Sequence, residues 1–184
     1  MYTFLDDKIL DENGLEIMMD WETDLMQEHA KIVTENGGDI LEIGFGMGIC
    51  SNFIQQANIN THTIIEIHDQ IFEKLLNWAK DKPNVIPIKG DWFDSIPNKK
   101  YDGIMFDTWK EKNAHHFLPN IESSLNKKGI VTWFNSSNKD VVEHNCNNLK
   151  WGTLTIKEIN VNPPKDTQYK YFNQKTYYIP KLAL

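Results

Sequence analysis

Short apolar runs and stretches of helical periodicity alternate along most of the chain. The apolar runs predict five strands, at residues 39–43, 61–67, 85–89, 101–106 and 130–134. Apolar positions that recur every three or four residues predict four helices, at residues 21–35, 49–57, 70–80 and 114–125. The segment before residue 21 is polar and shows neither pattern. Strands that are apolar throughout and alternate with helices indicate a parallel sheet covered on both faces.

The C-terminal part of the chain has a different pattern. Residues 153–161 and 169–179 alternate apolar and polar positions, and Pro163 and Pro164 lie between them. This predicts an antiparallel hairpin at the end of the sheet. Five parallel strands followed by a hairpin are the order expected of a class I S-adenosylmethionine-dependent methyltransferase. The predicted fold class is therefore α/β, a Rossmann-like, doubly wound, mostly parallel sheet with a C-terminal antiparallel hairpin.

Composition narrows the range of partners. The 184 residues carry 26 acidic and 19 basic side chains, a formal net charge of −7, and every basic residue is lysine. Without arginine, the chain cannot bind phosphates or guanine edges through a guanidinium fork. We therefore expect neither a nucleic acid nor a membrane as partner. The length predicts one domain over residues 1–184.

The compartment follows from patterns that the sequence lacks. The N-terminal residues MYTFLDDKIL show no signal peptide, and no apolar run reaches the length of a membrane span. Cys50 and Cys146 are far apart and form no CxxC pair, so we interpret them as ordinary buried thiols. These features predict a cytoplasmic protein.

A glycine-rich turn follows the first parallel strand. In LEIGFGMG, Gly44 and Gly46 permit close approach of a ligand to the backbone, and Gly48 opens a helix whose N-terminus is partly positive. Glu42, two residues before the first glycine, suits a cationic methionine moiety better than a pyrophosphate. A tight turn without ligand, or an NAD site, remains an alternative for this motif alone.

Two further signals follow the next strands. Glu66 ends the second strand, where its carboxylate could accept both ribose hydroxyls, and Asp91 and Trp92 follow the third, where they could flank an adenine. The alternatives are a solvated strand end for Glu66 and a plain core position for Trp92.

The acceptor side begins at Asp107, which follows the fourth strand and should face the methyl donor. The motif IMFDTW lacks the Asn/Asp-Pro-Pro-aromatic turn of many amino-group methyltransferases, and the chain lacks the two-glutamate loop of protein arginine methyltransferases. The next residues do not supply a metal-binding cluster, and we interpret His115 and His116 as a solvated helix start. No metal is expected.

Several motifs together resemble the guanidinoacetate N-methyltransferase family. They are MMDWET with the following Met26, GFGMG, EIHDQIF, VIPIKGDWFD, YDGIMFDTW and VNPP with the aromatic YKYF near the end. The resemblance implies cofactor contacts by Met18, Met26, Gly44, Phe45, Gly46, Met47, Gly48, Ile49, Glu66, Ile67, His68, Asp91 and Trp92. It also implies that Glu22 and Asp107 hold the guanidinium and that the backbone of Ser136 and Ser137 receives the carboxylate of the acceptor.

The chemistry of a guanidinium explains the two acids. A guanidinium has a pKa on the order of 13 and no free lone pair, so a base must take a proton as the new C–N bond forms. Two carboxylates pair with the edges of the planar cation and orient one nitrogen. We assign Asp107 as proton acceptor and Glu22 as orienting residue.

The chain departs from this family on the acceptor side. The segment before Met18, with residues 1–20 as a possible lid, is shorter than in the family, and the loops after Asp107 and Ser137 are trimmed. Guanidinoacetate is favoured as acceptor, with free arginine or another small guanidine as the alternative. A cofactor-binding subunit without turnover is a further alternative. The expected oligomeric state is a monomer or a homodimer.

Overall fold

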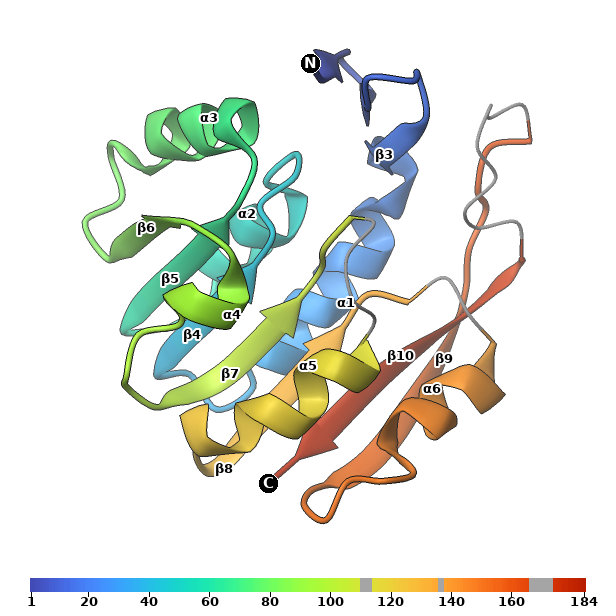
Figure 1. The fold of residues 1–184 in the computed structure, drawn as a ribbon. Helices are drawn as coiled ribbons and strands as arrows, with labels where there is room; N and C mark the ends of the chain where they lie inside the picture. The colour runs from blue at the N-terminus through green and yellow to red at the C-terminus, as the bar shows by residue number, and fades with distance from the viewer. Residues whose placement is uncertain (110–113, 136–137, 166–173) are drawn as a thin grey trace.

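The computed structural model describes residues 1–109, 114–135, 138–165 and 174–184. Its main element is a seven-stranded sheet with the strand order β6-β5-β4-β7-β8-β10-β9 (Figure 1). The strands are β4 (Asp39–Ile43), β5 (Thr61–Glu66), β6 (Val85–Lys89), β7 (Tyr101–Phe106), β8 (Leu125–Trp133), β9 (Thr153–Asn160) and β10 (Thr176–Ala183). The first five are parallel, and β10 is antiparallel to both β8 and β9. The predicted fold class, parallel core and terminal hairpin included, is confirmed.

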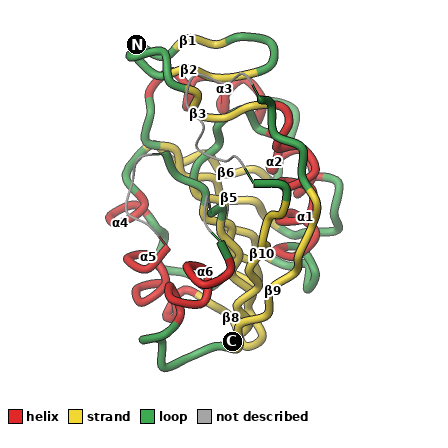
Figure 2. The backbone as a smooth tube through the Cα atoms, turned by 90° about the vertical axis from the view of Figure 1, so that its right-hand side faces the viewer, coloured by secondary structure: helices red, strands yellow, loops and turns green. Residues whose placement is uncertain are grey.

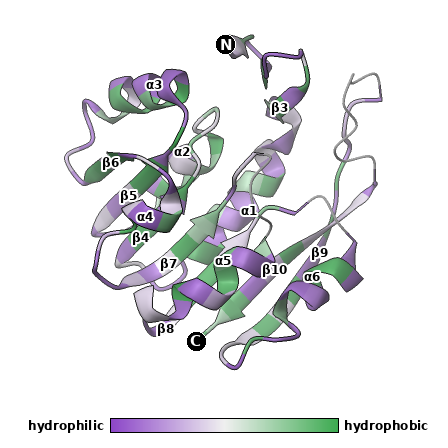
Figure 3. Ribbon diagram, viewed as in Figure 1, coloured by the Kyte–Doolittle hydropathy of each residue, from purple (hydrophilic) through white to green (hydrophobic). Residues whose placement is uncertain are grey.

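Helices cover both faces of the sheet. The helices are α1 (Thr23–Val33), α2 (Ile49–Gln55), α3 (Asp69–Ala79), α4 (Trp92–Ser95), α5 (Ala114–Ile121) and α6 (Lys139–Cys146). In the side view, α4, α5 and α6 lie on one side of the sheet, and α1, α2 and α3 lie on the other (Figure 2). Hydrophobic and hydrophilic positions alternate along α3 and α6, as expected of helices with one face on a sheet (Figure 3).

The strands are in a register that brings their carboxyl ends to one edge. Ile43 at the end of β4 pairs with Ile65 of β5 on one side and with Phe106 of β7 on the other. The turns that follow these three strands are therefore neighbours. The chain order reverses direction between β4 and β7, and in open α/β sheets such a point is where ligands bind.

The N-terminal segment forms a separate small sheet, which the sequence did not predict. Its antiparallel strands are β1 (Thr3–Phe4), β2 (Lys8–Leu10) and β3 (Glu16–Met19). They are too short to show a period, and the turn between β2 and β3 depends on Asp11, whose Oδ1 accepts the amides of Asn13 and Leu15 at 2.8 and 2.9 Å. No strand was predicted in this polar segment, and its possible role as a lid stays a prediction.

Two predicted boundaries also differ. The helix expected over residues 114–125 ends at Ile121, a 3-10 turn follows at Glu122–Ser124, and β8 already begins at Leu125. Lys128 has a positive φ of 69°, and the β7–β8 register shifts near this point. This irregularity lets β8 include residues 127–129, which the sequence pattern predicted as the end of a helix.

The last strand runs to Ala183 rather than to residue 179. Pro180, which has no N–H to donate, pairs with Ile156 of β9, whereas the pairing with β8 involves Leu182 and Ala183. Residues 169–173 of the predicted strand lie outside the described residues.

Candidate functional site

A cavity opens at the carboxyl ends of β4, β5 and β7, which is where ligands bind in open α/β sheets. Most of the predicted site residues lie in its wall: Met18, Glu22, Gly44, Gly46, Glu66, Ile67, His68, Asp91, Trp92 and Asp107. The fold thus brings together residues that are up to 89 positions apart, from Met18 to Asp107.

The glycine turn passes close to both neighbours. Gly44 has a φ of 88°, its amide donates to the Ile65 carbonyl at 2.9 Å, and a Cβ there would lie 1.8 Å from the Asp107 carbonyl oxygen. Gly46 has a φ of 53°, and a Cβ there would lie 2.5 Å from the Met18 sulfur. Only glycine satisfies both the backbone conformation and the space at these positions.

The Glu66 carboxylate holds the turns that frame the cavity. The side chain is 5% exposed, its Oε2 accepts the Phe45 amide at 2.9 Å, and its Oε1 accepts the His68 amide at 2.7 Å. Each carboxylate oxygen keeps a second lone pair. Glu66 therefore combines a structural role with the capacity to accept further hydrogen bonds from a ligand.

The third predicted signal consists of Asp91, which caps a helix, and Trp92, which packs in the core. Asp91 is the N-cap of α4, and its Oδ1 accepts the Phe93 amide at 2.9 Å. Trp92 is 5% exposed and packs edge to face against Phe106 and Phe117. Both residues also line the cavity. Trp92 thus occupies the core position that was expected as its alternative and is at the same time part of the cavity wall.

Five predicted cofactor residues do not belong to the described wall: Met26, Phe45, Met47, Gly48 and Ile49. Met26 is fully buried in the same apolar cluster as Met18. The Met47 amide donates to the Met18 sulfur at 3.3 Å. Cofactor contact by these residues stays a prediction.

The two acids of the predicted acceptor site lie in the same wall. Glu22 is 3% exposed, and its Oε1 accepts the Met19 amide at 2.8 Å. Asp107 continues β7, and its amide donates to the Ile43 carbonyl at 2.9 Å. Removal from bulk water raises the pKa of the half-buried Asp107 carboxyl to about 7, and the negative charges of Glu42 and Glu66 contribute. Asp107 thus resembles a base that exchanges its proton near neutral pH.

The sequence suggested that Glu42 lies near the ligand, but Glu42 is not among the residues that line the cavity. It is 1% exposed, its Oε2 accepts the Ser51 hydroxyl at 2.5 Å, and the same oxygen lies 2.9 Å from His62 Nε2. Its carboxylate therefore acts behind the glycine turn, where its charge reaches Asp107 through the core.

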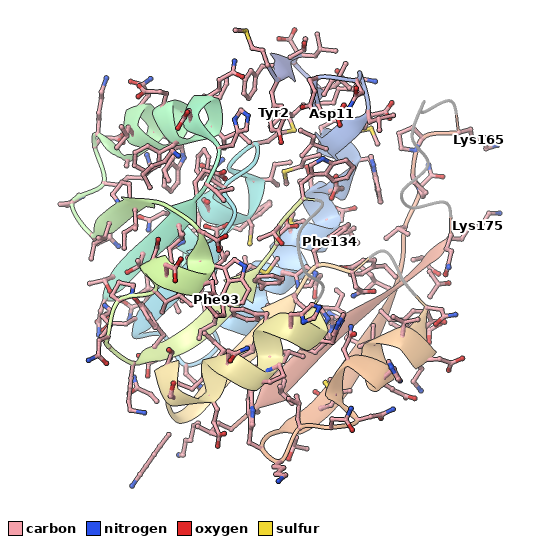
Figure 4. The ribbon with its side chains drawn as sticks, in the orientation of Figure 1. Tyr2, Asp11, Phe93, Phe134, Lys165 and Lys175 are labelled. Carbon is pink, nitrogen blue, oxygen red and sulfur yellow. The ribbon has the colours of Figure 1, made fainter. Side chains whose placement is uncertain are left out.

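Some wall residues were not predicted from the sequence. They are Tyr2, Ile17, Ile43, Ile65, Ile71, Gly90, Thr108, Trp109 and Phe134. Tyr2 precedes β1 and stacks on His68, with ring centroids 3.7 Å apart and an interplanar angle of 8°. Tyr2 and Phe134 reach the site from the N-terminal segment and from the end of β8 (Figure 4). A polar N-terminal segment gives no periodic signal by which Tyr2 could have been found.

The predicted carboxylate site at Ser136 and Ser137 lies outside the described residues. The residues on either side are described: Asn135 is 7% exposed, and Asn138 is the N-cap of α6, where its Oδ1 accepts the Val141 amide at 3.2 Å. Helix α6 thus begins directly after these residues.

The described residues contain no group of three or more His, Cys, Asp or Glu side chains placed to hold a metal ion. His115 and His116 are exposed at the start of α5, with ring centroids 3.9 Å apart. Cys50 is buried, whereas Cys146 is half-buried. Within the same described ranges, no helix is both long and apolar enough to cross a membrane.

Comparison with known proteins places the chain in a family. The family model described as guanidinoacetate N-methyltransferase matches residues 3–160. Protein arginine N-methyltransferase 2 of Candida glabrata is 31% identical, over 98% of this chain and 50% of that protein. The protein of the same name from Saccharomyces cerevisiae is 28% identical, over 95% of this chain and 49% of that protein. The chain spans about half or less of the length of the curated relatives it matches.

Solved structures share the fold at low sequence identity. N-methyltransferase NodS from Bradyrhizobium japonicum WM9, in complex with S-adenosyl-L-homocysteine, has a TM-score of 0.67 at 11% identity over 89% of this chain and 87% of that chain. The tRNA (m1A58) methyltransferase TrmI from Aquifex aeolicus has a TM-score of 0.64 at 12% identity over 100% of this chain and 89% of that chain.

These comparisons confirm the resemblance, the fold class and the cofactor expected from the sequence. The chain belongs to the guanidinoacetate N-methyltransferase family and has the class I methyltransferase fold, whose cofactor is S-adenosylmethionine.

Proposed function

We propose that the protein is an S-adenosylmethionine-dependent methyltransferase that methylates a guanidino group. One observation carries the proposal: the acids Glu22 and Asp107 line the same cavity as the glycine turn and Glu66. A methyl-donor site and a binding site for a planar cation would thus lie in one cavity.

The cavity residues fit the cofactor. Gly44 and Gly46 leave room for a close approach to the backbone, Glu66 has lone pairs for the ribose hydroxyls, and Asp91 and Trp92 line the region expected for adenine. When bound, S-adenosylmethionine supplies an electrophilic methyl group on a sulfonium.

The two carboxylates then account for the acceptor chemistry. Glu22 and Asp107 pair with the guanidinium and hold one nitrogen in position. Asp107 takes the proton that this nitrogen loses, because its pKa of about 7 makes it a stronger base than an ordinary aspartate. The product remains a guanidinium, so its ion pair with Glu22 persists after transfer, and Asp107 pairs with it again once its carboxyl has released the proton.

The charge of the wall favours an arginine side chain within a polypeptide as the acceptor. The described wall carries four carboxylates, at Glu22, Glu66, Asp91 and Asp107, and no lysine. An arginine side chain brings a positive charge and no carboxylate, whereas free guanidinoacetate brings its own carboxylate into a negative field. The name of the curated relatives, protein arginine N-methyltransferase 2, points to the same acceptor.

Guanidinoacetate, which the sequence alone favoured, is the second candidate. The description of the matching family model supports it. Its carboxylate would depend on the backbone near residues 136 and 137, and the same site would serve free arginine. A nucleic-acid acceptor is not supported by a chain with a net charge of −7 and no arginine, although the fold itself also occurs in a tRNA methyltransferase.

Methyl-labelled S-adenosylmethionine tests the proposal. The acceptors are a peptide with one arginine and blocked ends, the same peptide with lysine in its place, guanidinoacetate and free arginine. We expect label in the arginine peptide and none in the lysine peptide. Preferential labelling of guanidinoacetate would support the second candidate, and cofactor binding without labelling of any guanidine would identify a silent cofactor-binding subunit.

A further inference from the structure

A chain of hydrogen bonds crosses the core from α1 to the end of β8. His29 Nδ1 lies 2.7 Å from Thr132 Oγ1, and His29 Nε2 lies 3.0 Å from the Tyr177 hydroxyl. The Asn135 amide donates to the same hydroxyl at 2.9 Å. His29, Thr132 and Tyr177 are fully buried, so the hydrogen bonds among these three side chains are shielded from bulk water.

The partners fix the direction of each bond. The Thr132 hydroxyl donates its only hydrogen to the Pro180 carbonyl at 2.6 Å, so it accepts the hydrogen of His29 Nδ1. His29 Nε2 is then a lone pair and accepts the Tyr177 O–H. Burial lowers the pKa of His29 to about 3, so the imidazole stays neutral and this arrangement persists at neutral pH.

The same direction excludes Tyr177 as a proton carrier for the reaction. Its hydrogen is committed to His29, and burial raises the pKa of its hydroxyl well above the ordinary value, to which the charges of Asp107 and Glu22 add. The hydroxyl therefore remains protonated although it lies within electrostatic reach of both acids.

The hydrogen-bond network reaches the acceptor side of the cavity at Asn135. Asn135 follows Phe134, which lines the cavity, and the Asn135 side chain donates from Nδ2 to the Tyr178 carbonyl at 3.0 Å. At the other end, α1 begins directly after Glu22. One buried hydrogen-bond network thus connects the helix that follows Glu22 with the point where the polypeptide leaves β8.

We propose that Tyr177 is a positioning residue for the acceptor. Through Asn135 it fixes the backbone that leaves β8 next to Phe134, and through His29 it ties this backbone to the helix that follows Glu22. The inference rests on the proposed guanidino methylation, and it assigns an acceptor-side role to a residue that is not in the cavity wall. The cofactor side, formed by the glycine turn and Glu66, does not depend on this network.

Three variants test the role. Tyr177→Phe removes the hydroxyl, and Tyr178→Phe makes the same change at the neighbouring residue, whose hydroxyl takes no part in the chain. Thr132→Val breaks the distal end and leaves the bond between Tyr177 and Asn135. For each variant we would measure hydrogen exchange of the Asn135 amide by NMR, the dissociation constant of S-adenosylmethionine, and kcat and KM for the guanidine that the wild-type protein methylates.

Tyr177→Phe is expected to accelerate exchange at Asn135 about tenfold or more. It is expected to raise the acceptor KM about tenfold, with a change of less than about twofold in the cofactor dissociation constant. Tyr178→Phe should match the wild type, and Thr132→Val should leave exchange and KM within about threefold even where it lowers the melting temperature.

Two outcomes would overturn the inference: unchanged exchange and KM in Tyr177→Phe, or equal KM changes in Tyr177→Phe and Thr132→Val, which would indicate a general loss of packing. Exchange at Asn135 needs no turnover. A wild-type protein that methylates no guanidine would therefore reject the proposed function while the exchange data still decide whether Tyr177 holds Asn135.

Discussion

The sulfur of Met18 lies against Gly46, so close that a Cβ on residue 46 would be 2.5 Å from it. Met18 belongs to β3 of the small N-terminal sheet and Gly46 to the turn after β4. The two residues thus connect the N-terminal segment to the donor side of the cavity. This supports the proposal that residues 1–20 cover the donor site.

Gly46→Val is expected to abolish binding of S-adenosylmethionine. The positive φ of 53° is strained for valine, and its side chain would displace Met18 from the wall. Gly152→Val is the matched control, because Gly152 also has a positive φ, of 77°, but lies outside the cavity wall. Calorimetry should show loss of binding in the first variant alone. Tighter binding of NAD than of S-adenosylmethionine by the wild-type protein would refute the donor site itself.

Asp107→Asn is expected to remove methyl transfer and to leave cofactor binding nearly intact. A general base contributes typically ~10² to 10⁴-fold to the rate, and asparagine cannot accept the proton. Asp94→Asn, at an exposed acid of α4 outside the wall, serves as control. Single-turnover rates and cofactor titrations measure both effects. A variant that keeps more than about a tenth of the wild-type rate would show that Asp107 is not the base.

The rate should depend on the protonation of Asp107. Only the carboxylate accepts a proton, and the pKa of this group is raised to about 7. We therefore expect kcat/KM to fall about tenfold per pH unit below neutrality and to level off above it. The acceptor guanidinium does not titrate in this range. A flat profile from pH 5 to 8, recorded with saturating cofactor, would contradict the assignment.

The sequence predicted the parts of the molecule that repeat a period. The five parallel strands and the glycine turn follow from apolar runs and from Gly44 and Gly46, because a buried strand and a tight turn limit the residue types locally. Asp107 was predicted from its position at the end of the fourth strand, whereas Glu22 was found from motifs that resemble a known family.

The remaining features depend on contacts between distant segments. The sheet of β1 to β3 consists of strands of two to four residues, which carry no measurable period. The stacking of Tyr2 on His68 and the burial of Glu42 behind the glycine turn arise only once the chain is folded. No local pattern contains this information.

Asp107→Asn is also expected to stabilise the protein at high pH. The folded-state pKa of about 7 lies above the ordinary value of 3.8, so the folded state binds the proton more tightly than the unfolded state does. The contribution of Asp107 to stability is thus fully present below pH 3.8 and is lost as the pH rises through 7. Since one pKa unit corresponds to about 1.4 kcal/mol and the group is only half-buried, asparagine should gain on the order of 2 kcal/mol at pH 8. Denaturant unfolding at pH 5 and pH 8 measures the difference, and a variant less stable than wild type at pH 8 would contradict it.

Glu22→Gln separates the charge of this residue from its structural hydrogen bond. Glutamine keeps a side-chain oxygen that can accept the Met19 amide, so the start of α1 should be retained. The loss of negative charge removes one of the two ion pairs with the guanidinium. A hydrogen bond to a charged partner contributes about 1.5 to 3 kcal/mol, which corresponds to an increase of about 10 to 150-fold in acceptor KM. Glu28→Gln, on the exposed ion pairs of α1 with Lys31 and Lys157, is the control for charge alone. An unchanged acceptor KM in Glu22→Gln, with melting temperature and cofactor affinity as in the wild type, would show that Glu22 only caps the helix and that Asp107 binds the guanidinium without it.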